Sequence, residues 1–441
     1  MELPQYVLRC IDALEEAHFS AYAVGGCVRD ALLGLTPHDY DLCTNATPEQ
    51  IRYVFSQYRL VLAGEKHGTV TVLTDGGPVE ITTYRSEGNY TDSRHPGWVK
   101  FVTDIADDLS RRDFTVNAMA FSPYRGFADP FGGREDLRQR CLRAVGDPAQ
   151  RFTEDSLRIL RGVRFSVKYH LTPDAQTLDA MFRLAPSMDQ LARERVFTEL
   201  SGLLPLVSAN DLHTFQPILT QIIPELAPAV GFDQKNVHHT LDLYSHTAQV
   251  VASVPGVLHL RLAALLHDVG KPATFSLDDS GCGHFYGHAQ VGAEMANSIL
   301  LRMKTSTALR RQVVDLVQWH MTPLEPDKRL LRRRLGKLGF SAVWDLLALQ
   351  QADLGGKASP EERHRFQQIA DLLKEIESED SCLSLKDLAI NGADLIALGF
   401  TPGPGIKQCL AHLLSAVQEE QLENKKDALL NSARAYLEEM I

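Results

Sequence analysis

The first 145 residues of the chain contain both segments with helical periodicity and short apolar runs. Apolar positions recur at helical spacing between residues 4 and 19, which predicts an amphipathic helix there. Apolar runs at 58–62, 69–73 and 79–84 are separated by glycine-containing turns, a pattern typical of strands. This part of the chain is therefore expected to form a small mixed sheet with helices around it.

A second helix is predicted to start at Thr47, because Pro48 follows at the first helical position and Gln50 completes a capping-box pattern. It should run to about Gln57. The polar, glycine-containing stretch 85–102 has no clear period, so we expect a mobile loop there.

Helical periodicity dominates the rest of the chain. The fold class expected is α+β, in which a small mixed-sheet head over residues 1–145 is followed by mostly α-helical parts. These are a neck over residues 146–230, a histidine-rich body over 231–360 and a charged tail over 361–441.

Residues 23–41 hold the first pattern with chemical meaning. Gly25 and Gly26 precede a helix that carries Arg29 in its first turn, and Asp39 and Asp41 follow in what we predict to be a strand. Alternate strand residues share a face, and two adjacent carboxylates suit a cation such as Mg²⁺. Glycine lets the backbone approach a phosphate closely, with the arginine as an added cation. The alternatives are a simple tight turn and a solvated strand end.

Two further groups in the head are candidates for the same site. Glu80 lies among apolar strand residues, where it is either a third carboxylate of the site or an exposed side chain. Arg111, Arg112 and Asp113 are expected near the start of a helix over 107–120, where arginine can clamp a phosphate and aspartate can accept from a ribose hydroxyl. A surface ion pair is the alternative.

The segment 151–165 is predicted to be one helix that carries Asp155, Arg158, Arg161 and Arg164 along a single stripe. A carboxylate and an arginine side by side fit the Watson–Crick edges of cytosine and adenine, so Asp155 and Arg158 could read a nucleotide base without a template. The stripe could instead be a solvated helix face. Residues 192–200 are expected to act as a charged scaffold.

The body carries a different constellation, in which a His-Asp pair precedes Gly-Lys-Pro and further histidines flank it on predicted helices. Imidazole and carboxylate together suit a divalent transition metal. The candidate ligands are His246, His267, Asp268, His288, His320 and Asp353.

Bulk composition excludes some classes. The 441 residues contain 44% hydrophobic and 23% charged residues, without an apolar run long enough to span a membrane. The start of the chain does not resemble a signal peptide, which favours a cytoplasmic protein, and seven scattered cysteines fit reduced thiols there. The net charge of −11 argues against a general polyanion binder, although basic residues cluster at 111–112, 158–164 and 328–337.

These motifs together resemble the DNA polymerase beta nucleotidyltransferase superfamily and, within it, the class II bacterial tRNA nucleotidyltransferases. The body resembles the HD phosphohydrolase superfamily. The resemblance implies a tRNA 3′ end, CTP and ATP as substrates, Gly26, Arg29 and Arg112 on the nucleotide, Mg²⁺ on Asp39 and Asp41, and base recognition by Asp155 and Arg158 with Arg161 and Arg164 nearby. It also implies an RNA-holding tail.

Three products are possible within this resemblance. Bacterial poly(A) polymerases carry a basic segment where this chain has residues 63–70, and enzymes limited to two cytidines have a shortened loop where this chain keeps Tyr90, Asp92, Arg94 and His95. We therefore expect C, C and A all to be added. An A-adding or poly(A)-adding enzyme, and an HD phosphohydrolase whose head only binds nucleotide, remain alternatives. The body could hydrolyse phosphate esters or serve as a metal-stabilised scaffold, and the sequence does not give the oligomeric state.

Overall fold

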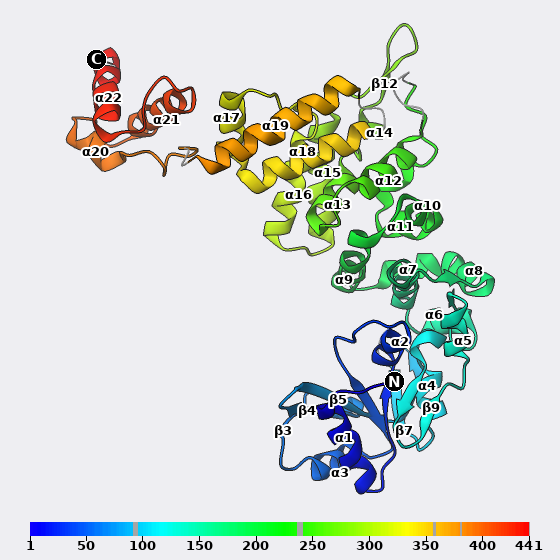
Figure 1. The fold of residues 1–441 in the computed structure, drawn as a ribbon. Helices are drawn as coiled ribbons and strands as arrows, with labels where there is room; N and C mark the ends of the chain where they lie inside the picture. The colour runs from blue at the N-terminus through cyan, green and yellow to red at the C-terminus, as the bar shows by residue number, and fades with distance from the viewer. Residues whose placement is uncertain (91–95, 236–240, 356–358, 380–381, 441) are drawn as a thin grey trace. The chain divides into compact units, whose positions relative to one another are not determined.

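The computed structural model describes residues 1–90, 96–235, 241–355, 359–379 and 382–440 (Figure 1). The chain divides into two compact units. The first comprises residues 1–207 and 211–227, and the second comprises 208–210 and 228–441. The predicted head and neck thus fall together, as do the predicted body and tail, while the finer division into four parts stays a prediction.

The head is built on a seven-stranded sheet, which confirms the predicted mixed sheet. Its order is β3-β4-β5-β2-β1-β8-β9, and β2 and β5 run parallel while the other neighbours are antiparallel. The strands are β1 Ala21–Val24, β2 Asp41–Thr44, β3 Arg59–Val61, β4 Thr69–Thr74, β5 Gly77–Thr83, β8 Ala120–Ser122 and β9 Gly126–Ala128. Inward side chains such as Val70, Val72, Val79 and Ile81 are fully buried, so hydrophobic burial fixes the register.

Three helices of the head lie where the sequence pattern placed them. They are α1 Gln5–Glu16, α2 Gly26–Leu32 and α3 Pro48–Val54. The capping box at α3 is present, since the Thr47 side chain accepts from the Gln50 amide and the Gln50 side chain accepts from the Thr47 amide. The helix ends three residues before the predicted end.

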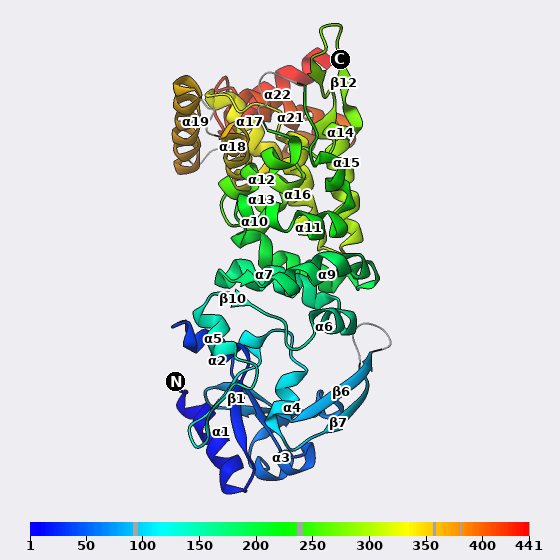
Figure 2. The same cartoon turned by 90° about the vertical axis from the view of Figure 1, so that its right-hand side faces the viewer.

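The prediction of a mobile loop over 85–102 is wrong. Two antiparallel strands, β6 Arg85–Tyr90 and β7 Pro96–Phe101, form a two-stranded ribbon, labelled in Figure 2. Gly88 pairs with Trp98 and leaves room for the indole ring, because a Cβ on Gly88 would lie 2.5 Å from it. The ribbon is held by hydrogen bonds between two strands that are separated in the sequence. The periodicity of a single segment could therefore not reveal it. Asp92, Arg94 and His95 lie outside the described residues.

Two predicted helices, one at the end of the head and one in the neck, differ in the structure. The helix predicted over 107–120 is a short helix, α4 Ile105–Ser110, followed by a 3₁₀ turn, η2 Thr115–Asn117, so Arg111 to Asp113 follow a helix end and do not begin a helix. The helix predicted over 151–165 is broken into α6 Pro148–Glu154 and α7 Leu157–Tyr169. Asp155 is extended at the break, and its carboxylate accepts from the Leu157 amide, which competes with helix continuation.

The remaining elements of the first unit are helical apart from two short strands. They are α5 Gly133–Arg138, β10 Cys141–Leu142, β11 Thr172–Pro173, α8 Ala175–Leu184, α9 Arg193–Leu203 and α11 Gln216–Ile222, with α10 Ala209–Thr214 at the boundary between the units. Short 3₁₀ helices lie at η1 Glu65–His67, η3 Ala185–Gln190, η4 Leu204–Leu206 and η5 Pro224–Ala229.

The second unit is almost entirely helical, as predicted. Its elements are α12 Leu243–Ser253, α13 Leu258–Leu266, α14 Lys271–Thr274, β12 Ser276–Leu277, β13 Gly283–His284, α15 His288–Arg302, α16 Thr307–Trp319, α17 Lys328–Leu338, α18 Phe340–Leu354, α19 Pro360–Ser378, α20 Gly392–Ala397, α21 Pro404–Gln418 and α22 Lys426–Met440. A small core at the C-terminal end centres on Leu395, Leu413 and Leu429. Within the described ranges, no helix combines the length and apolar character needed to cross a bilayer.

Candidate active site and metal centre

A cavity of about 570 Å³ in the first unit gathers the predicted head and neck residues. Apart from Glu80, every residue proposed from the sequence for nucleotide or Mg²⁺ binding lines it. These are Gly26, Arg29, Asp39, Asp41, Arg111, Arg112, Asp113, Asp155, Arg158, Arg161 and Arg164. The head thus supplies the paired carboxylates and three of these arginines, and the neck supplies the other three and Asp155.

The two aspartates lie at one end of a strand. Asp41 begins β2, whereas Asp39 lies just before the strand and not in it as predicted. The Asp41 side chain faces the open cavity, and desolvation together with the charges of Asp39 and Glu80 raises its pKa to about 6, although Arg112 opposes this. Mutually repelling carboxylates beside a cavity fit a divalent cation, which would remove this repulsion.

Glu80 sits beside Asp41 on the neighbouring strand. Its Cα is the register partner of the Asp41 Cα in the parallel pair of β2 and β5, and its side chain is exposed. It is not among the described residues that line the cavity. Glu80 therefore acts on the Asp41 charge from the next strand, and its role as a direct ligand stays a prediction.

Arg112 is set against the glycine turn. Gly25 has a positive φ of 76°, and a Cβ there would lie 2.8 Å from Arg112 Nη1, so glycine is needed both for conformation and for space. Arg112 Nη2 is 3.4 Å from Asp108 Oδ2. Its Nε is buried and has no hydrogen-bond partner among the described residues. Arg112 is among the residues that line the cavity, next to the glycine turn.

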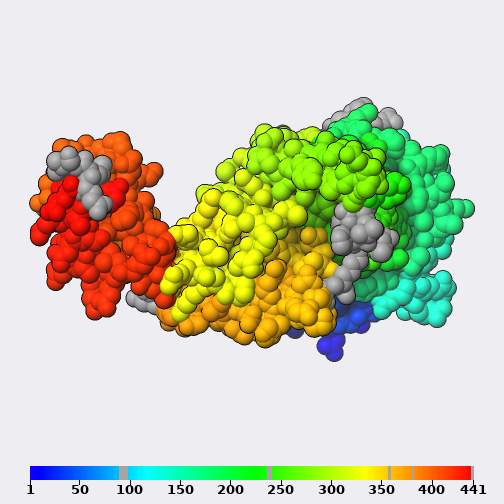
Figure 3. Space-filling view, turned by 90° about the horizontal axis from the view of Figure 1, so that it is seen from above, coloured from blue at the N-terminus to red at the C-terminus, as the bar shows by residue number. Residues whose placement is uncertain are grey.

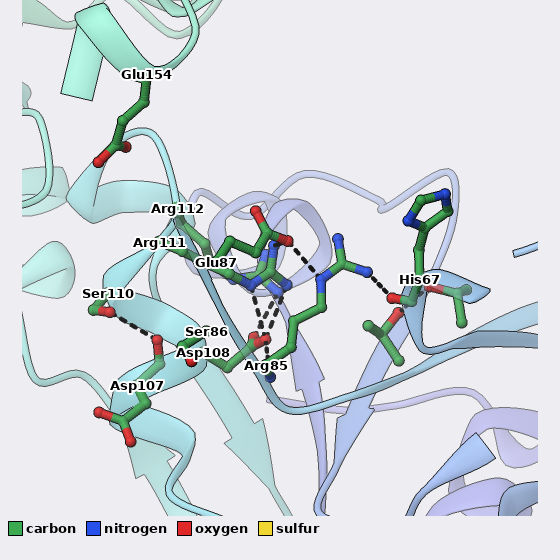
Figure 4. A network of polar contacts seen from close by, with 12 residues as sticks. His67, Arg85, Ser86, Glu87, Asp107, Asp108, Ser110, Arg111, Arg112 and Glu154 are labelled. Carbon is green, nitrogen blue, oxygen red and sulfur yellow. Dashed lines mark hydrogen bonds and ion pairs between the residues drawn. The ribbon is translucent and has the colours of Figure 1, made fainter. Parts of the chain in front are cut away.

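Arg111 belongs to a polar network at the base of the β6–β7 ribbon (Figure 4). Its guanidinium donates to Asp108 at 2.9–3.0 Å and to Glu87 at 3.2 Å, and Glu87 also accepts from Arg85 at 2.6 Å. Arg85 in turn donates to the His67 carbonyl. Asp108 is fully buried, and although burial opposes it, the two arginines lower its pKa. These carboxylates hold Arg111 at the wall of the cavity.

Arg29 is buried and every nitrogen of its guanidinium is engaged. It donates to Asp30 at 2.7 and 2.8 Å, to Asn117 at 2.5 Å and to the Tyr169 hydroxyl at 2.5 Å. The guanidinium carbon also lies 4.0 Å from the centroid of the Tyr169 ring. In this state Arg29 ties α2 to the end of α7, so its predicted contact with a phosphate would require one of these bonds to exchange.

Asp113 and Arg161 form an ion pair between the head and the neck. The Arg161 guanidinium donates from Nε to Asp113 Oδ2 at 2.8 Å, and Asn117 donates to the other oxygen at 3.0 Å. Burial works against ionisation, yet Arg161 and Asn117 lower the pKa of Asp113 to about 2. Arg164, one turn further along α7, pairs with Glu199 of α9 at 2.6 Å. The arginine stripe is thus internally neutralised.

The two proposed base readers each have another partner. Asp155 Oδ2 accepts from Arg195 at 2.9 Å, whereas Arg158 pairs with Glu154 at 2.9 Å and donates to the Arg111 carbonyl at 3.0 Å. The Arg158 amide donates to the Asp155 carbonyl at 3.0 Å, but within the described residues no side-chain hydrogen bond or ion pair joins the two. Both side chains nevertheless line the same cavity, so their polar edges can face one ligand.

Sequence reasoning missed several residues of this cavity. Lys168 and Tyr169 continue the face of α7 that carries Arg161 and Arg164, so helical spacing could have identified them. Arg195 comes from the segment interpreted only as a scaffold, and no local pattern links it to Asp155. The others are Asp30, His38, Asn117, Leu157 and Phe165.

The second unit brings all six predicted metal ligands together. His246, His267, Asp268 and Asp353 form one group of donors, and Asp268, His288 and His320 form another, so Asp268 belongs to both. His246 Nε2 is 2.9 Å from Asp353 Oδ1, and His267 Nε2 is 3.1 Å from Asp268 Oδ2. His288 Nε2 is 3.4 Å from Asp268 Oδ1 and 3.3 Å from His320 Nε2.

Backbone carbonyls orient three of these histidines. His267 Nδ1 lies 2.8 Å from the Ala264 oxygen, His288 Nδ1 lies 2.7 Å from the Phe285 oxygen, and His320 Nδ1 lies 2.6 Å from the Val317 oxygen. A carbonyl only accepts, so each Nδ1 carries the proton and each Nε2 lone pair faces the cluster. His267 Nε2 is buried and lies 3.1 Å from Asp268 Oδ2, and Lys271 Nζ lies 2.7 Å from the same oxygen. This donor set fits a divalent metal.

Two known protein families each match one part of the chain, one in the first unit and one in the second. Residues 21–143 match the family described as "Poly A polymerase head domain", and residues 284–433 match the one described as "tRNA nucleotidyltransferase domain 2 putative". The first match spans the sheet and the paired aspartates. The second covers α15 to α21 and part of α22.

Relatives extend the similarity over the whole chain. A CCA-adding enzyme of Streptococcus suis is 32% identical over 98% of this chain and 97% of its own length, and one of Limosilactobacillus fermentum is 33% identical over 96% and 94%. The chain belongs to the family of CCA-adding enzymes. Among solved structures, the Bacillus stearothermophilus CCA-adding enzyme in complex with CTP has 26% identity and a TM-score of 0.76, over 100% of this chain and 99% of that one. The family assignment therefore rests on both sequence and fold.

Proposed function

We propose that this chain adds C, C and A to the 3′ end of tRNA, with CTP and ATP as substrates and without a nucleic-acid template. The observation that carries the proposal is the cavity of the first unit, which the Asp39 and Asp41 carboxylates line together with Arg111, Arg112 and Arg158. Membership of the family of CCA-adding enzymes supports the same activity. Action on tRNA implies a cytoplasmic location.

Asp39 and Asp41 would hold Mg²⁺, as the raised pKa of Asp41 and the mutual repulsion of the carboxylates support. Bound there, Mg²⁺ supplies activation of the tRNA 3′-hydroxyl and offsets charge on the pyrophosphate leaving group. The chain itself orients the triphosphate. Arg112 lines the cavity and would contact the phosphates, and the glycine turn leaves room for its guanidinium where a Cβ on Gly25 would lie 2.8 Å from Nη1.

Base selection falls to Asp155 and Arg158. The carboxylate accepts from the exocyclic amine that cytosine and adenine share, and the guanidinium donates to the adjacent ring nitrogen. Uracil and guanine present a carbonyl in place of that amine, so they would leave the carboxylate facing another acceptor. Arg195 and Glu154 hold the two side chains in position through separate ion pairs.

The experiment that tests this function uses three tRNA transcripts, which end before CCA, after C and after CC. Each is incubated with every nucleoside triphosphate in turn and with Mg²⁺. Ordered addition that stops at CCA is the expected result. Addition of A alone to the CC-ended transcript, or long A tails on any RNA, would instead identify an A-adding enzyme or a poly(A) polymerase.

We propose a second activity for the helical unit, namely metal-dependent hydrolysis of phosphomonoesters or cyclic phosphates at damaged RNA ends. The convergence of four histidines and two aspartates, with Nε2 lone pairs facing inward, favours it over a purely structural cluster. A divalent transition metal held by side chains of either donor group would supply an activated water. The buried Lys271, with Nζ 2.7 Å from Asp268 Oδ2, adds a positive charge beside the cluster.

This second activity is tested with a tRNA that ends in a 2′,3′-cyclic phosphate and with a chromogenic phosphomonoester. Loss of both bound metal and hydrolysis in His267→Ala, with unchanged CCA addition, is expected because the two sites lie in different units. The matched control is His412→Ala, a histidine of α21 that belongs to neither donor group. Equal hydrolysis by His267→Ala and the wild type would exclude this proposal.

A further inference from the structure

Helix α17 carries six basic residues, and the partners of five of them divide these five into two groups. Lys328, Arg332 and Arg333 pair with carboxylates of α19 and of the segment around the end of α21. Lys328 Nζ, for example, lies 2.8 Å from Glu375 and 2.6 Å from Glu379. These three cations are neutralised inside the unit, as expected for a helix packed against acidic neighbours.

Arg334 and Lys337 differ from this first group. Their charges lie over the ring of Trp319, with the Arg334 guanidinium carbon 4.6 Å and the Lys337 Nζ 4.1 Å from the ring centroid. No ion pair links either cation to a carboxylate in the part of the chain that the structure describes. Trp319 therefore gathers two positive charges through cation–π contacts and leaves both without an anionic partner.

These residues line a cavity of about 350 Å³ at the surface. Apolar side chains form much of its wall, including Pro323, Leu324 and the half-exposed Leu330, and Glu325 is the acidic residue among those that line it. Figure 3 shows the segment around α17, in yellow, at the molecular surface beside the orange α19. Partial burial lowers the pKa of the Arg334 guanidinium, so its charge is less favourable here than in open water.

Two adjacent cations in a partly apolar hollow are stabilised most by an anion that touches both. The chain as a whole carries a net charge of −11, so an unneutralised cationic surface stands out from its surroundings. A phosphodiester supplies the anion, and the attached sugar or base supplies an apolar face for the wall of the hollow. We propose that Trp319, Arg334 and Lys337 form an RNA-backbone-binding surface that holds tRNA by its phosphates, an inference that rests on the proposed tRNA substrate.

The test is tRNA affinity as a function of salt concentration. Labelled tRNA lacking CCA is titrated with the full-length protein by fluorescence anisotropy at several KCl concentrations. Arg334→Gln/Lys337→Gln, which removes both charges, is expected to weaken binding by about tenfold and to flatten the slope of log affinity against log salt by about 1.5, the value for roughly two lost phosphate contacts. Arg334→Glu/Lys337→Glu should weaken binding further because it adds repulsion.

The matched control is Arg311→Gln/Lys374→Gln, which removes the same charge from exposed positions of α16 and α19 in the same unit. It is expected to bind tRNA with almost the wild-type affinity and salt slope. If the Arg334 and Lys337 variants stay folded and bind tRNA as tightly as the control does, the surface does not contact RNA. An acidic peptide that binds the wild type more tightly than tRNA does would also overturn the proposal.

Failure of the proposed function gives a different result. Wild-type protein that binds tRNA through this surface but adds no nucleotide would contradict the CCA-adding activity and leave the RNA surface in place. Wild-type protein that completes CCA normally, with variants that lose neither affinity nor salt dependence, would contradict only the surface. Extension and binding are therefore measured on the same preparations.

Discussion

The Arg195 guanidinium of α9 lies 2.9 Å from the Asp155 carboxylate, although 40 residues separate them along the chain. Asp155 occupies the break between α6 and α7, where its other oxygen accepts from the Leu157 amide. Both carboxylate oxygens are thus fixed before any nucleotide binds. A side chain interpreted from the sequence as a scaffold thereby sets the orientation of a proposed base reader.

Replacement of Arg195 by alanine is expected to lower kcat/KM for CTP and ATP by about 10- to 100-fold, the value for loss of a hydrogen bond to a charged group. Discrimination against UTP should fall as well, because a mobile Asp155 no longer opposes the uracil carbonyl. Steady-state kinetics with each nucleotide measure both effects. Arg193→Ala on the same helix is the control, and Arg195→Lys should restore part of the selectivity. Unaltered selectivity in Arg195→Ala would separate this pair from base recognition.

The carboxylates of the head should contribute unequally. Asp41→Asn is expected to reduce CCA addition by about a thousandfold or more, because it removes a proposed Mg²⁺ ligand that faces the cavity. Glu80→Gln should cost no more than about tenfold, since Glu80 reaches the site only through its charge on Asp41. Single-turnover extension of a CC-ended tRNA compares the two. Equal losses would make Glu80 a direct ligand.

The Asp113–Arg161 pair predicts an acid-dependent contribution to stability. The pKa of Asp113 in the folded protein, about 2, lies below the unfolded value, so its stabilising effect is complete above about pH 4 and is lost as the pH falls towards 2. Asp113→Asn should therefore lower the melting temperature of the protein at pH 7, and the difference from wild type should shrink below pH 4. Thermal melts at pH 7, 5, 4 and 3 test this. Asp179→Asn, which removes an exposed carboxylate 3.8 Å from Arg183, is the control.

Close packing at Gly133 predicts that a larger residue there would disturb η2, which contacts Arg29 in the cavity. A Cβ on Gly133 would lie 2.1 Å from the Thr115 carbonyl oxygen, and this backbone belongs to η2, whose Asn117 accepts from Arg29. Gly133→Ala is expected to destabilise the first unit by about 1–3 kcal/mol and to raise KM for both nucleotides. Gly405→Ala, where a Cβ meets no atom within 4 Å, should leave the melting temperature and KM nearly unchanged. A silent Gly133→Ala would mean that η2 can shift without cost.

Local signals carried the sequence analysis where a few neighbouring residues decide the structure. The capping box at Thr47 and Gln50 is one such case, since both partners lie within one helical turn. The ribbon at 85–101 was missed because strand pairing joins residues up to 16 positions apart, such as Arg85 and Phe101. The break at Asp155 was missed because helical spacing outweighed the tendency of an aspartate to bind its own backbone.

The candidate site divides in the same way. Paired aspartates, the arginine stripe and the His-Asp pair are visible because motif spacing places them, and the cavity gathers nearly all of the head and neck residues. The partners of those residues are not visible, because Glu199 reaches Arg164 and Arg195 reaches Asp155 only through the packing of α9 against α7. Sequence patterns name the groups that carry chemistry, and tertiary packing decides which groups hold them.

The ion pairs that the neck arginines form within the protein affect the rate of turnover. Arg158, Arg161 and Arg164 each pair with a carboxylate of the protein, so an arriving nucleotide competes with these carboxylates for the three guanidinium groups. The binding free energy of the nucleotide then contains only the difference between the new and the old interaction. Each nucleotide is therefore held loosely. An enzyme that binds three nucleotides in succession gains turnover from this arrangement, because each added nucleotide must leave the site before the next one binds. The ion pairs of the neck can thus form again after each nucleotide has been added.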